Sequence, residues 1–332
     1  MYTANDARYE KMEYVKTGVS GLKLPRVSLG LWHNFGLNDD FDMMKAILTT
    51  AFDNGITHFD LANNYGPVGG AAETNFGKIL KDEFAAYRNE LVISTKAGYF
   101  MWPGPYGDHG SKKYLVSSLN DSLKRMGLDY VDIFYHHRMD PETPLEETCE
   151  ALDGIVKSGK ALYIGLSNYD GETMTRACAI FKELHTPFII NQNRFNIFDR
   201  FIEKNGLAIA AKREGKGVIT FSPLDQGQLT ERYLDGIPED SRAMREGSFL
   251  KAKDISQKKI KRVRELSVMA GERGQTMAEF ALSWVLSHDF VTSVLIGASK
   301  PEQVLDNIKI VGQKALSTEE MEKVDEIVGS MK

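Results

Sequence analysis

The sequence has only two cysteines, Cys149 and Cys178, among 332 residues. Both stand in stretches whose apolar spacing predicts helices, and such a pair offers neither a disulfide framework nor a zinc-ligand spacing. We therefore expect two small buried thiols in a reducing compartment.

Long apolar runs are also missing. Residues 1–11 are polar and charged where a signal peptide would need an apolar core, and no later stretch reaches about 18 uninterrupted apolar residues. These absences predict a cytoplasmic protein without a membrane partner.

The chain also has only a small excess of charge of one sign, since 41 Lys and Arg stand against 46 Asp and Glu, a formal net charge of −5. No cluster of five or six basic residues is present, so we expect no nucleic acid partner. The 42% hydrophobic and 26% charged residues are ordinary for globular proteins, which excludes disordered and collagen-like chains.

What the sequence does contain is a regular alternation of strand and helix patterns. Short β-rich apolar runs lie at 27–30, 56–59, 91–95, 131–135, 161–165, 188–191, 218–221 and 291–296. Amphipathic helical patterns separate them, for example 111–126, which Gly127 ends. Because this alternation implies parallel strands with right-handed crossovers, it predicts an α/β fold, an eight-stranded (β/α)8 TIM barrel.

Length alone favours two domains, at about 150 residues each. A doubly wound open sheet would need a G-x-G-x-x-G turn after an early strand, yet the one G-x-G, at 215–217, precedes a strand. With no linker in the sequence, we predict one domain over 1–332. Three segments account for the residues beyond a minimal barrel of about 250. They are a β-hairpin at 13–24 that plugs the N-terminal end of the barrel, a long loop with more than one helix at 224–290, and a helix at 317–328.

The carboxyl ends of the predicted strands carry polar side chains, and barrel active sites are built at those ends. In chain order the strand ends supply Trp32, Asp60, Lys96, His136 with His137, Ser167 with Asn168, Gln192 with Asn193, Ser222, and Gly297 with Ser299. Each alone has an ordinary structural explanation. Their convergence on one rim favours an active site there.

The residue types at this rim indicate acid catalysis without a metal. His136 and His137 are adjacent on a strand and face opposite sides, which argues against a two-His metal site and leaves open which of them faces the reactive centre. Tyr65 follows Asp60 by five residues. The ammonium of Lys96 could lower the pKa of this phenol, with Asp60 as its counter-ion. Such a group suits proton donation to a carbonyl that receives a hydride from a nicotinamide.

These residues resemble the aldo-keto reductases over nearly the whole chain. The resemblance rests on Asp60, Tyr65, Lys96 and His137, with Ser167-Asn168, Gln192, 221–224 (FSPL) and 296–299 (IGAS). Within that superfamily, segments 30–36 (GLWHNFG), 101–107 (MWPGPYG) and 132–138 (DIFYHHR) are most similar to bacterial L-glyceraldehyde 3-phosphate reductases, whose nearest relatives are beta subunits of voltage-gated potassium channels.

The resemblance implies an NADPH-dependent reductase with Tyr65 as proton donor, Lys96 and Asp60 tuning it, and His137, which precedes Arg138, orienting the carbonyl. It implies cofactor contacts from Trp32, Asp60, Ser167, Asn168, Gln192, Phe221, Ser222, Pro223, Leu224, Gln226, Gly227, Arg232, Arg242, Gly297, Ser299, Lys300, Gln303 and Asn307. Residues 299–302 also form a capping-box pattern, and a helix start beside Lys300 suits a 2′-phosphate. Candidate substrate contacts are Trp32, His33, Tyr65, Trp102, His137 and Arg138.

Three functions remain open at this point. The first is reduction of small aldehydes such as L-glyceraldehyde 3-phosphate or methylglyoxal, in a homo-oligomer that the resemblance suggests is a tetramer or octamer. The second is a redox-sensing subunit that binds nucleotide with little turnover. The third is a metal-dependent barrel hydrolase, which would lose its activity to chelators. Since the channel beta subunits carry Asn where this chain has His137, the resemblance favours the reductase.

Overall fold

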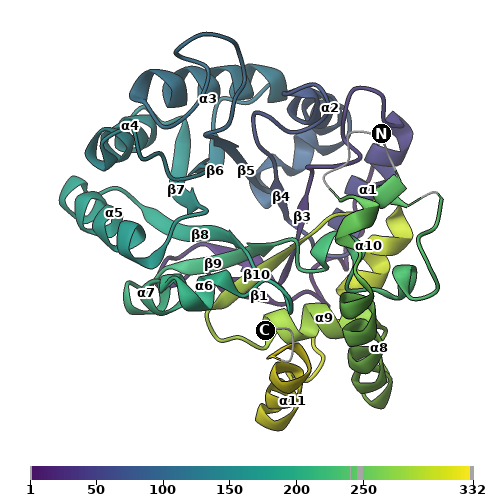
Figure 1. Cartoon of the computed structure of the whole chain (residues 1–332). Coiled ribbons are helices and arrows are strands. Elements are labelled where there is room, and N and C mark those ends of the chain that lie inside the picture. The colour runs from purple at the N-terminus through teal and green to yellow at the C-terminus, as the bar shows by residue number, and fades with distance from the viewer. Residues whose placement is uncertain (1, 240, 245–249, 330–332) are drawn as a thin grey trace.

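The computed structural model describes residues 2–239, 241–244 and 250–329, and its centre is a closed barrel of eight parallel strands (Figure 1). The strands are β3 (Val27–Gly30), β4 (His58–Asp60), β5 (Val92–Ala97), β6 (Val131–His136), β7 (Ala161–Ser167), β8 (Phe188–Arg194), β9 (Gly217–Phe221) and β10 (Val291–Ile296). Pairing of β10 with β3 closes the barrel. The predicted (β/α)8 barrel is confirmed.

Two details of the strands differ from the prediction. Strand β4 begins at His58 rather than Ile56, because the Ile56 amide donates to the Ala51 carbonyl and so still belongs to the turn after the preceding helix. Strands β7 and β8 continue past the apolar runs as far as Ser167 and Arg194. Ladder pairing therefore carries polar residues to the barrel mouth even where the apolar pattern has stopped.

Helices surround the barrel, because the outward side chains of the strands are largely apolar and must be covered. They are α1 (Phe41–Asp53), α2 (Ala71–Ile79), α3 (Lys112–Met126), α4 (Leu145–Lys157), α5 (Gly171–Leu184), α6 (Phe201–Lys204), α7 (Leu207–Arg213), α8 (Gln257–Glu272), α9 (Met277–Leu286), α10 (Pro301–Ile308) and α11 (Thr318–Gly329). Short turns of helix are η1 (Leu80–Phe84), η2 (Ala85–Glu90), η3 (Asp225–Gly227), η4 (Glu231–Tyr233), η5 (Arg242–Met244) and η6 (Ala252–Asp254).

Helix α3 shows why the ends of a helix can be predicted from its sequence. The Ser111 hydroxyl accepts from the Tyr114 amide at 3.3 Å and caps the helix, and Gly127 ends it at a φ of 66°. Cys149 and Cys178 are buried and free in α4 and α5, as predicted. In the described part of the chain, no helix is long and apolar enough to span a membrane.

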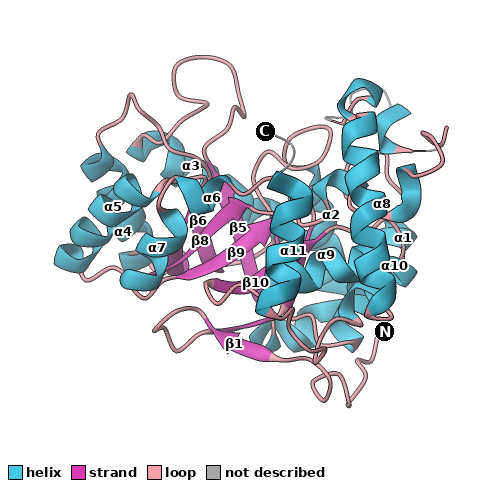
Figure 2. Cartoon of the chain, turned by 60° about the horizontal axis from the view of Figure 1, so that its bottom comes forward, coloured by secondary structure: helices cyan, strands magenta, loops and turns pink. Residues whose placement is uncertain are grey.

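The predicted hairpin is present as β1 (Tyr14–Lys16) and β2 (Lys23–Pro25), and Figure 2 shows it below the barrel. Leu24 is fully buried in a cluster with Ile133, Ile190 and Ile219 of the barrel strands. The Val19 amide donates to the Gly215 carbonyl at 3.0 Å, just before β9 begins. The hairpin thus closes the amino-terminal end of the barrel, which leaves the carboxyl end for ligands.

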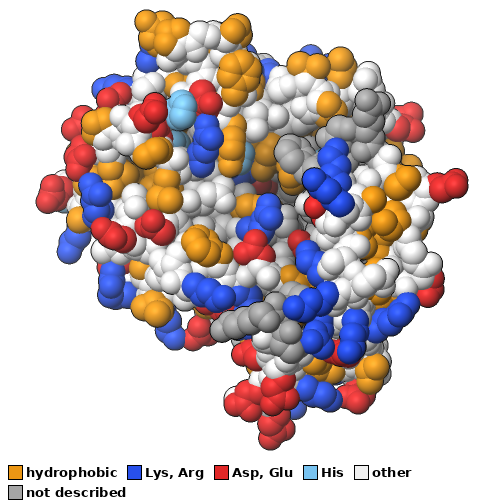
Figure 3. All heavy atoms as spheres, viewed as in Figure 1, with side chains coloured by type: hydrophobic (Ala, Val, Ile, Leu, Met, Phe, Trp, Pro, Cys, Tyr) orange, Lys and Arg blue, Asp and Glu red, His pale blue; other side chains and the backbone are white. Residues whose placement is uncertain are grey.

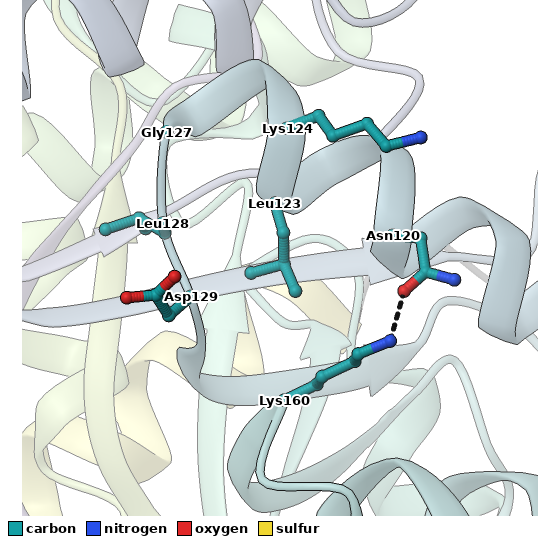
Figure 4. Close-up of a pocket in the computed structure, with 7 residues that line it drawn as sticks. All are labelled: Asn120, Leu123, Lys124, Gly127, Leu128, Asp129 and Lys160. Carbon is teal, nitrogen blue, oxygen red and sulfur yellow. Dashed lines mark hydrogen bonds between the residues drawn. The ribbon is translucent and has the colours of Figure 1, made fainter.

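A small hollow of about 530 Å³ lies between the end of α3 and the start of β7 (Figure 4). The Lys160 ammonium donates to the Asn120 side-chain oxygen at 2.6 Å across it. The contact joins a helix to the amino-terminal end of a strand, so this hollow is remote from the strand ends at which the polar side chains gather.

Candidate active site

A cleft of about 1590 Å³ occupies the carboxyl end of the barrel. Figure 3 shows this face, on which Lys and Arg side chains gather over the side of α8 and α10. The predicted residues that line the cleft are Trp32, His33, Asp60, Tyr65, His137, Asn168, Gln192, Phe221, Ser222, Pro223, Leu224, Gln226, Gly227, Arg232, Arg242, Gly297, Ser299, Gln303 and Asn307. The structure therefore brings most of the predicted site together.

Five predicted residues lie outside the lining. Lys96 and Ser167 are buried beneath it. Trp102 packs on the Tyr114 ring with a 5.3 Å centroid separation, and Lys300 is exposed before α10. Arg138 donates to the Gly98 carbonyl and the Asp108 carboxylate, each at 2.7 Å, and its guanidinium lies over the Tyr99 ring.

Lys96 sits at the centre of the site, and its ammonium has an acceptor for each of its three N–H groups. Its Nζ lies 2.5 Å from Asp60 Oδ2, 2.6 Å from the Leu61 carbonyl and 3.3 Å from the Tyr65 hydroxyl. Because the Tyr65 oxygen accepts from Lys96, the phenol's own proton is available to the cleft that Tyr65 lines.

Asp60 is held from both of its oxygens. Oδ1 accepts from the Ser94 hydroxyl at 2.6 Å and from the Gln192 amide at 3.1 Å, while Oδ2 accepts from Lys96. A carboxylate with three donors is satisfied even at 1% exposure. The Asp60–Lys96 ion pair is therefore held in a fixed position, and the Lys96 ammonium contacts the Tyr65 hydroxyl from it.

The acidity of Tyr65 departs from the sequence prediction. Burial raises the pKa of Tyr65 well above its usual value, and the nearby Asp60 and Tyr99 raise it further. Burial also lowers the pKa of Lys96, against the pull of Asp60. A neighbouring ammonium alone would lower the pKa of Tyr65, but desolvation outweighs it. Tyr65 thus retains its proton at neutral pH, and the ammonium beside it can stabilise the phenolate as that proton leaves.

The two adjacent histidines do face opposite sides of β6. His136 Nδ1 lies 2.7 Å from the Tyr169 hydroxyl, outside the barrel mouth. His137 lines the cleft, with its ring centroid 5.8 Å from that of Tyr65 and 4.7 Å from that of Tyr99. Burial lowers the pKa of His137 well below its usual value, with Lys96 adding to the effect. His137 is therefore a neutral imidazole that can direct one N–H into the cleft.

The cleft's other arm, from Phe221 to Asn307, suits an elongated polar ligand. Ser222, Asp225, Gln226 and Gly227 all have positive φ, between 46° and 92°, which turns the backbone sharply along the cleft wall. Asn64, Asn193 and Gln226 line the cleft, and their side-chain oxygens are buried without a hydrogen-bond partner among the residues that the structure describes. Acceptors of this kind, an aromatic ring and nearby arginines fit a nicotinamide dinucleotide.

The start of α10 differs from the predicted capping box. The N-cap is Lys300 rather than Ser299, because Pro301 takes the first helical position. Glu302 then lies too early for the reciprocal bond. The Ser299 amide and hydroxyl instead donate to the Gln303 side-chain oxygen, at 2.8 and 3.2 Å. This contact holds Gln303 at the cleft.

The sequence did not point to several lining residues, including Tyr99, Glu279 and Asp306. Tyr99 follows Lys96 by three residues, and Asp306 lies on the helix face that carries Gln303, so spacing from predicted residues could have found both. Glu279 lies in α9, and no local pattern connects it to the rim.

Comparisons with known proteins agree with this geometry. A model of the aldo/keto reductase family matches residues 26–329. The chain is 52% identical to a protein of Escherichia coli strain K12 named L-glyceraldehyde 3-phosphate reductase, over 98% of this chain and 95% of that protein. It is 34% identical to a probable voltage-gated potassium channel subunit beta of Oryza sativa subsp. japonica, over 96% and 97%. A putative subunit of the same kind in Schizosaccharomyces pombe is 36% identical, over 94% and 92%.

Proposed function

This chain belongs to the aldo/keto reductase family and is an oxidoreductase, and we propose that it reduces small aldehydes to alcohols with NADPH. The observation that carries the proposal is the Lys96 ammonium, whose contacts with Asp60 and Leu61 leave it beside the Tyr65 hydroxyl. A partly buried, protonated phenol that opens on a cleft is a proton donor for a carbonyl oxygen.

In this mechanism the chain's own residues move and hold the proton. Tyr65 gives its proton to the carbonyl oxygen as charge develops there, and Lys96 stabilises the phenolate that remains. His137, neutral and 5.8 Å from Tyr65 between ring centroids, directs an N–H to the same oxygen and orients it. NADPH, when bound, supplies the hydride for the carbonyl carbon.

Different residues of the cleft would hold different parts of the cofactor. Asn168 and Gln192, with Ser167 behind them, would hold the nicotinamide amide, while Trp32, Asp60 and Phe221 form its surroundings. Residues 222–227 with Arg232 and Arg242 would hold the phosphates, and Gly297, Ser299, Lys300, Gln303 and Asn307 the adenosine end. Arg232 and Arg242 supply the cations that a pyrophosphate requires.

We propose L-glyceraldehyde 3-phosphate and methylglyoxal as substrates. The name of the E. coli relative supports the first, and the rings of Trp32, Tyr65 and Tyr99, which line the cleft, offer apolar walls to either compound. His33 is the candidate partner for a substrate phosphate, because Arg138 is engaged by Asp108 and Trp102 packs on Tyr114. We also propose a cytoplasmic enzyme that acts as one domain over 1–332 and assembles into a tetramer or octamer.

The test follows NADPH absorbance with each aldehyde for the wild type and for Lys96→Met. We expect turnover in the wild type and a loss of about a hundredfold or more in the variant, since the phenolate then lacks its stabilising charge. Lys124→Met, which changes an exposed lysine on α3, is the matched control. Nucleotide binding without reduction of either aldehyde would instead favour a redox-sensing subunit, the alternative suggested by the channel relatives.

A further inference from the structure

A continuous chain of buried hydrogen bonds runs through the barrel interior to Asp60, and the mechanism above makes no use of it. Ser293 of β10 lies 2.8 Å from Ser28 of β3, between hydroxyl oxygens. Ser28 Oγ lies 3.0 Å from His58 Nδ1, and His58 Nε2 lies 2.9 Å from Ser94 Oγ. All four side chains have no exposed surface.

The direction of this chain follows from its last member. The Ser94 hydroxyl lies 2.6 Å from Asp60 Oδ1, and a carboxylate can only accept. Since the Ser94 proton points to Asp60, the Ser94 oxygen must accept from His58 Nε2. His58 Nδ1 then accepts from Ser28, and Ser28 accepts from Ser293.

His58 therefore has one defined form, a neutral ring with its proton on Nε2. Burial lowers the pKa of His58 to about 4, with Asp60 raising it and Lys96 lowering it. Other ionisable groups also act on Lys96 and Tyr65. Glu73 raises the pKa of Lys96, and Asp60 and Tyr99 raise the pKa of Tyr65. A neutral His58 can sustain the chain throughout the neutral pH range.

Packing alone does not account for these residues. Four polar side chains in a barrel interior cost free energy that apolar residues of similar volume would avoid. Here the neighbouring strands β3, β4 and β5 supply Ser28, His58 and Ser94 in turn, and the series ends on the carboxylate that holds Lys96.

We propose that His58 is a positioning residue for the reduction, which acts through Ser94 to fix Asp60 and thereby Lys96 and Tyr65. This inference rests on the proposed function. The chain keeps Asp60 Oδ1 occupied and its carboxylate plane fixed, so that Oδ2 faces Lys96. Loss of the Ser94 or His58 contact leaves Oδ1 with only the Gln192 amide at 3.1 Å, which lets the carboxylate turn and moves the ammonium away from the Tyr65 hydroxyl.

The kinetic test compares Ser94→Ala with Thr95→Val. Both variants delete one buried hydroxyl that donates to a carboxylate from the same strand, but Thr95 bonds to Glu73 on the other face, at 2.5 Å. Glu73 keeps Arg125 as a partner at 2.7 Å in the control. We expect Ser94→Ala to lower kcat for methylglyoxal about tenfold or more while KM changes less than about threefold, and Thr95→Val to leave kcat unchanged. Equal losses of kcat in the two variants, or an unchanged kcat in Ser94→Ala, would overturn the proposal.

A second measurement needs no turnover. Nitrogen-15 NMR of histidine-labelled wild type reports which ring nitrogen carries the proton, and His58→Gln assigns the His58 signals. We expect the neutral Nε2–H form near pH 7. An Nδ1–H or doubly protonated ring would reverse or break the chain and overturn the proposal. Should the wild type reduce no aldehyde, the proposed function fails while this tautomer still decides whether the chain exists.

Discussion

The three N–H groups of Lys96 determine what Tyr65 can do. Two of them are directed to Asp60 and to the Leu61 carbonyl, so the ammonium is held in place without the phenol. The third reaches the Tyr65 hydroxyl at 3.3 Å, a contact that strengthens when negative charge forms on that oxygen. Tyr65 therefore depends on Lys96, whereas Lys96 does not depend on Tyr65.

A Tyr65→Phe variant should separate chemistry from binding. Removing the hydroxyl leaves the Lys96–Asp60 pair intact, so we expect kcat to fall by about 10²–10⁴ while the Kd for NADPH changes less than about twofold. Steady-state rates and fluorescence titration of NADPH measure the two quantities. Tyr99→Phe is the matched control, since this phenol also flanks His137 but has no contact with the Lys96 ammonium in the described structure. Retention of a tenth of the wild-type rate would rule out Tyr65 as the donor.

Single residues differ in how far the sequence could place them. Asp60 and Lys96 end apolar runs, and strand geometry alone brings their side chains to one rim. Arg138 also follows a strand, yet its partner Asp108 lies thirty residues earlier in a loop, and that pairing has no local signal. Gly165 is similar, because a Cβ there would lie 2.2 Å from the Tyr135 ring, a contact visible only in the fold.

At the scale of elements, two segments shape the cofactor arm of the cleft: the start of α10 and the turn of residues 222–227 after β9. Lys300 is exposed at the N-cap of α10, next to Ser299 and three residues before Gln303, both of which line the cleft. The helix N-terminus and the ammonium together favour an anion at this position.

Lys300→Ala should therefore weaken NADPH far more than NADH, because only NADPH carries a 2′-phosphate. We expect the Kd for NADPH to rise about tenfold or more and the Kd for NADH to change less than about twofold. Titration of both cofactors measures this difference. Lys314→Ala, an exposed lysine beyond the same helix, serves as control. Equal weakening of the two cofactors would remove Lys300 from the 2′-phosphate site.

The turn of residues 222–227 is fastened from α8. Lys259 donates to Asp225 Oδ2 at 2.7 Å, and the Gln228 amide donates to the same oxygen at 3.0 Å. Asp225 itself has a φ of 46°, a conformation that a residue other than glycine adopts only when its neighbours hold it. Because this pair joins the turn to a helix far along the chain, it fixes the wall of the cleft.

Lys259→Met should loosen that wall without touching the reacting atoms. We expect the Kd for NADPH to rise about three- to thirtyfold and kcat at saturating NADPH to stay within about twofold, since the phosphates lose a fixed wall while Tyr65 and Lys96 are unchanged. Lys261→Met on the exposed face of the same helix is the control. A fall in kcat with unchanged cofactor affinity would contradict this role of the turn.

The elements also show where sequence patterns stop being informative. Capping at Ser111 and Gly127 involves neighbours in sequence, so the ends of α3 are predicted correctly. Residues 299–302 match the capping-box sequence, but Pro301 shifts the helix start by one residue and so changes the hydrogen-bond partners at that end. The turn after β9 depends on Lys259, and distant partners of that kind leave no periodic signal.

For the whole molecule, the barrel follows from spacing because each strand and helix repeats a local pattern and closure has one simple solution. The strongly buried polar groups are a different matter, since they arise from strands that meet only in the folded chain. Among them are His58 inside the barrel, His136 outside it and His137 at the mouth. Their effect is on the stability of the whole fold.

Burial lowers the pKa of His58 and of His136 to about 4, and it lowers that of His137 as well. Unfolded histidines bind protons below about 6.5, so between pH 6.5 and 4 the unfolded state holds more protons than the folded one. The stability that these neutral rings confer is complete above pH 6.5 and is lost as the pH falls toward 4. By pH 5 the loss is about 2 kcal/mol for each of His58 and His136, a large fraction of a stability of about 5–15 kcal/mol.

Denaturant unfolding at pH 7.5, 6.5, 5.5 and 5.0 should therefore show a midpoint that falls steadily below pH 6.5. His136→Gln, which keeps the chemistry of the cleft, should flatten that dependence, because one of the buried rings no longer gains a proton on unfolding. His185→Asn, at an exposed helix end whose left-handed backbone asparagine tolerates, should leave the dependence as it is. A midpoint constant from pH 7.5 to 5.0 would mean that the folded and unfolded states bind protons equally, and burial would then not lower the pKa of these histidines.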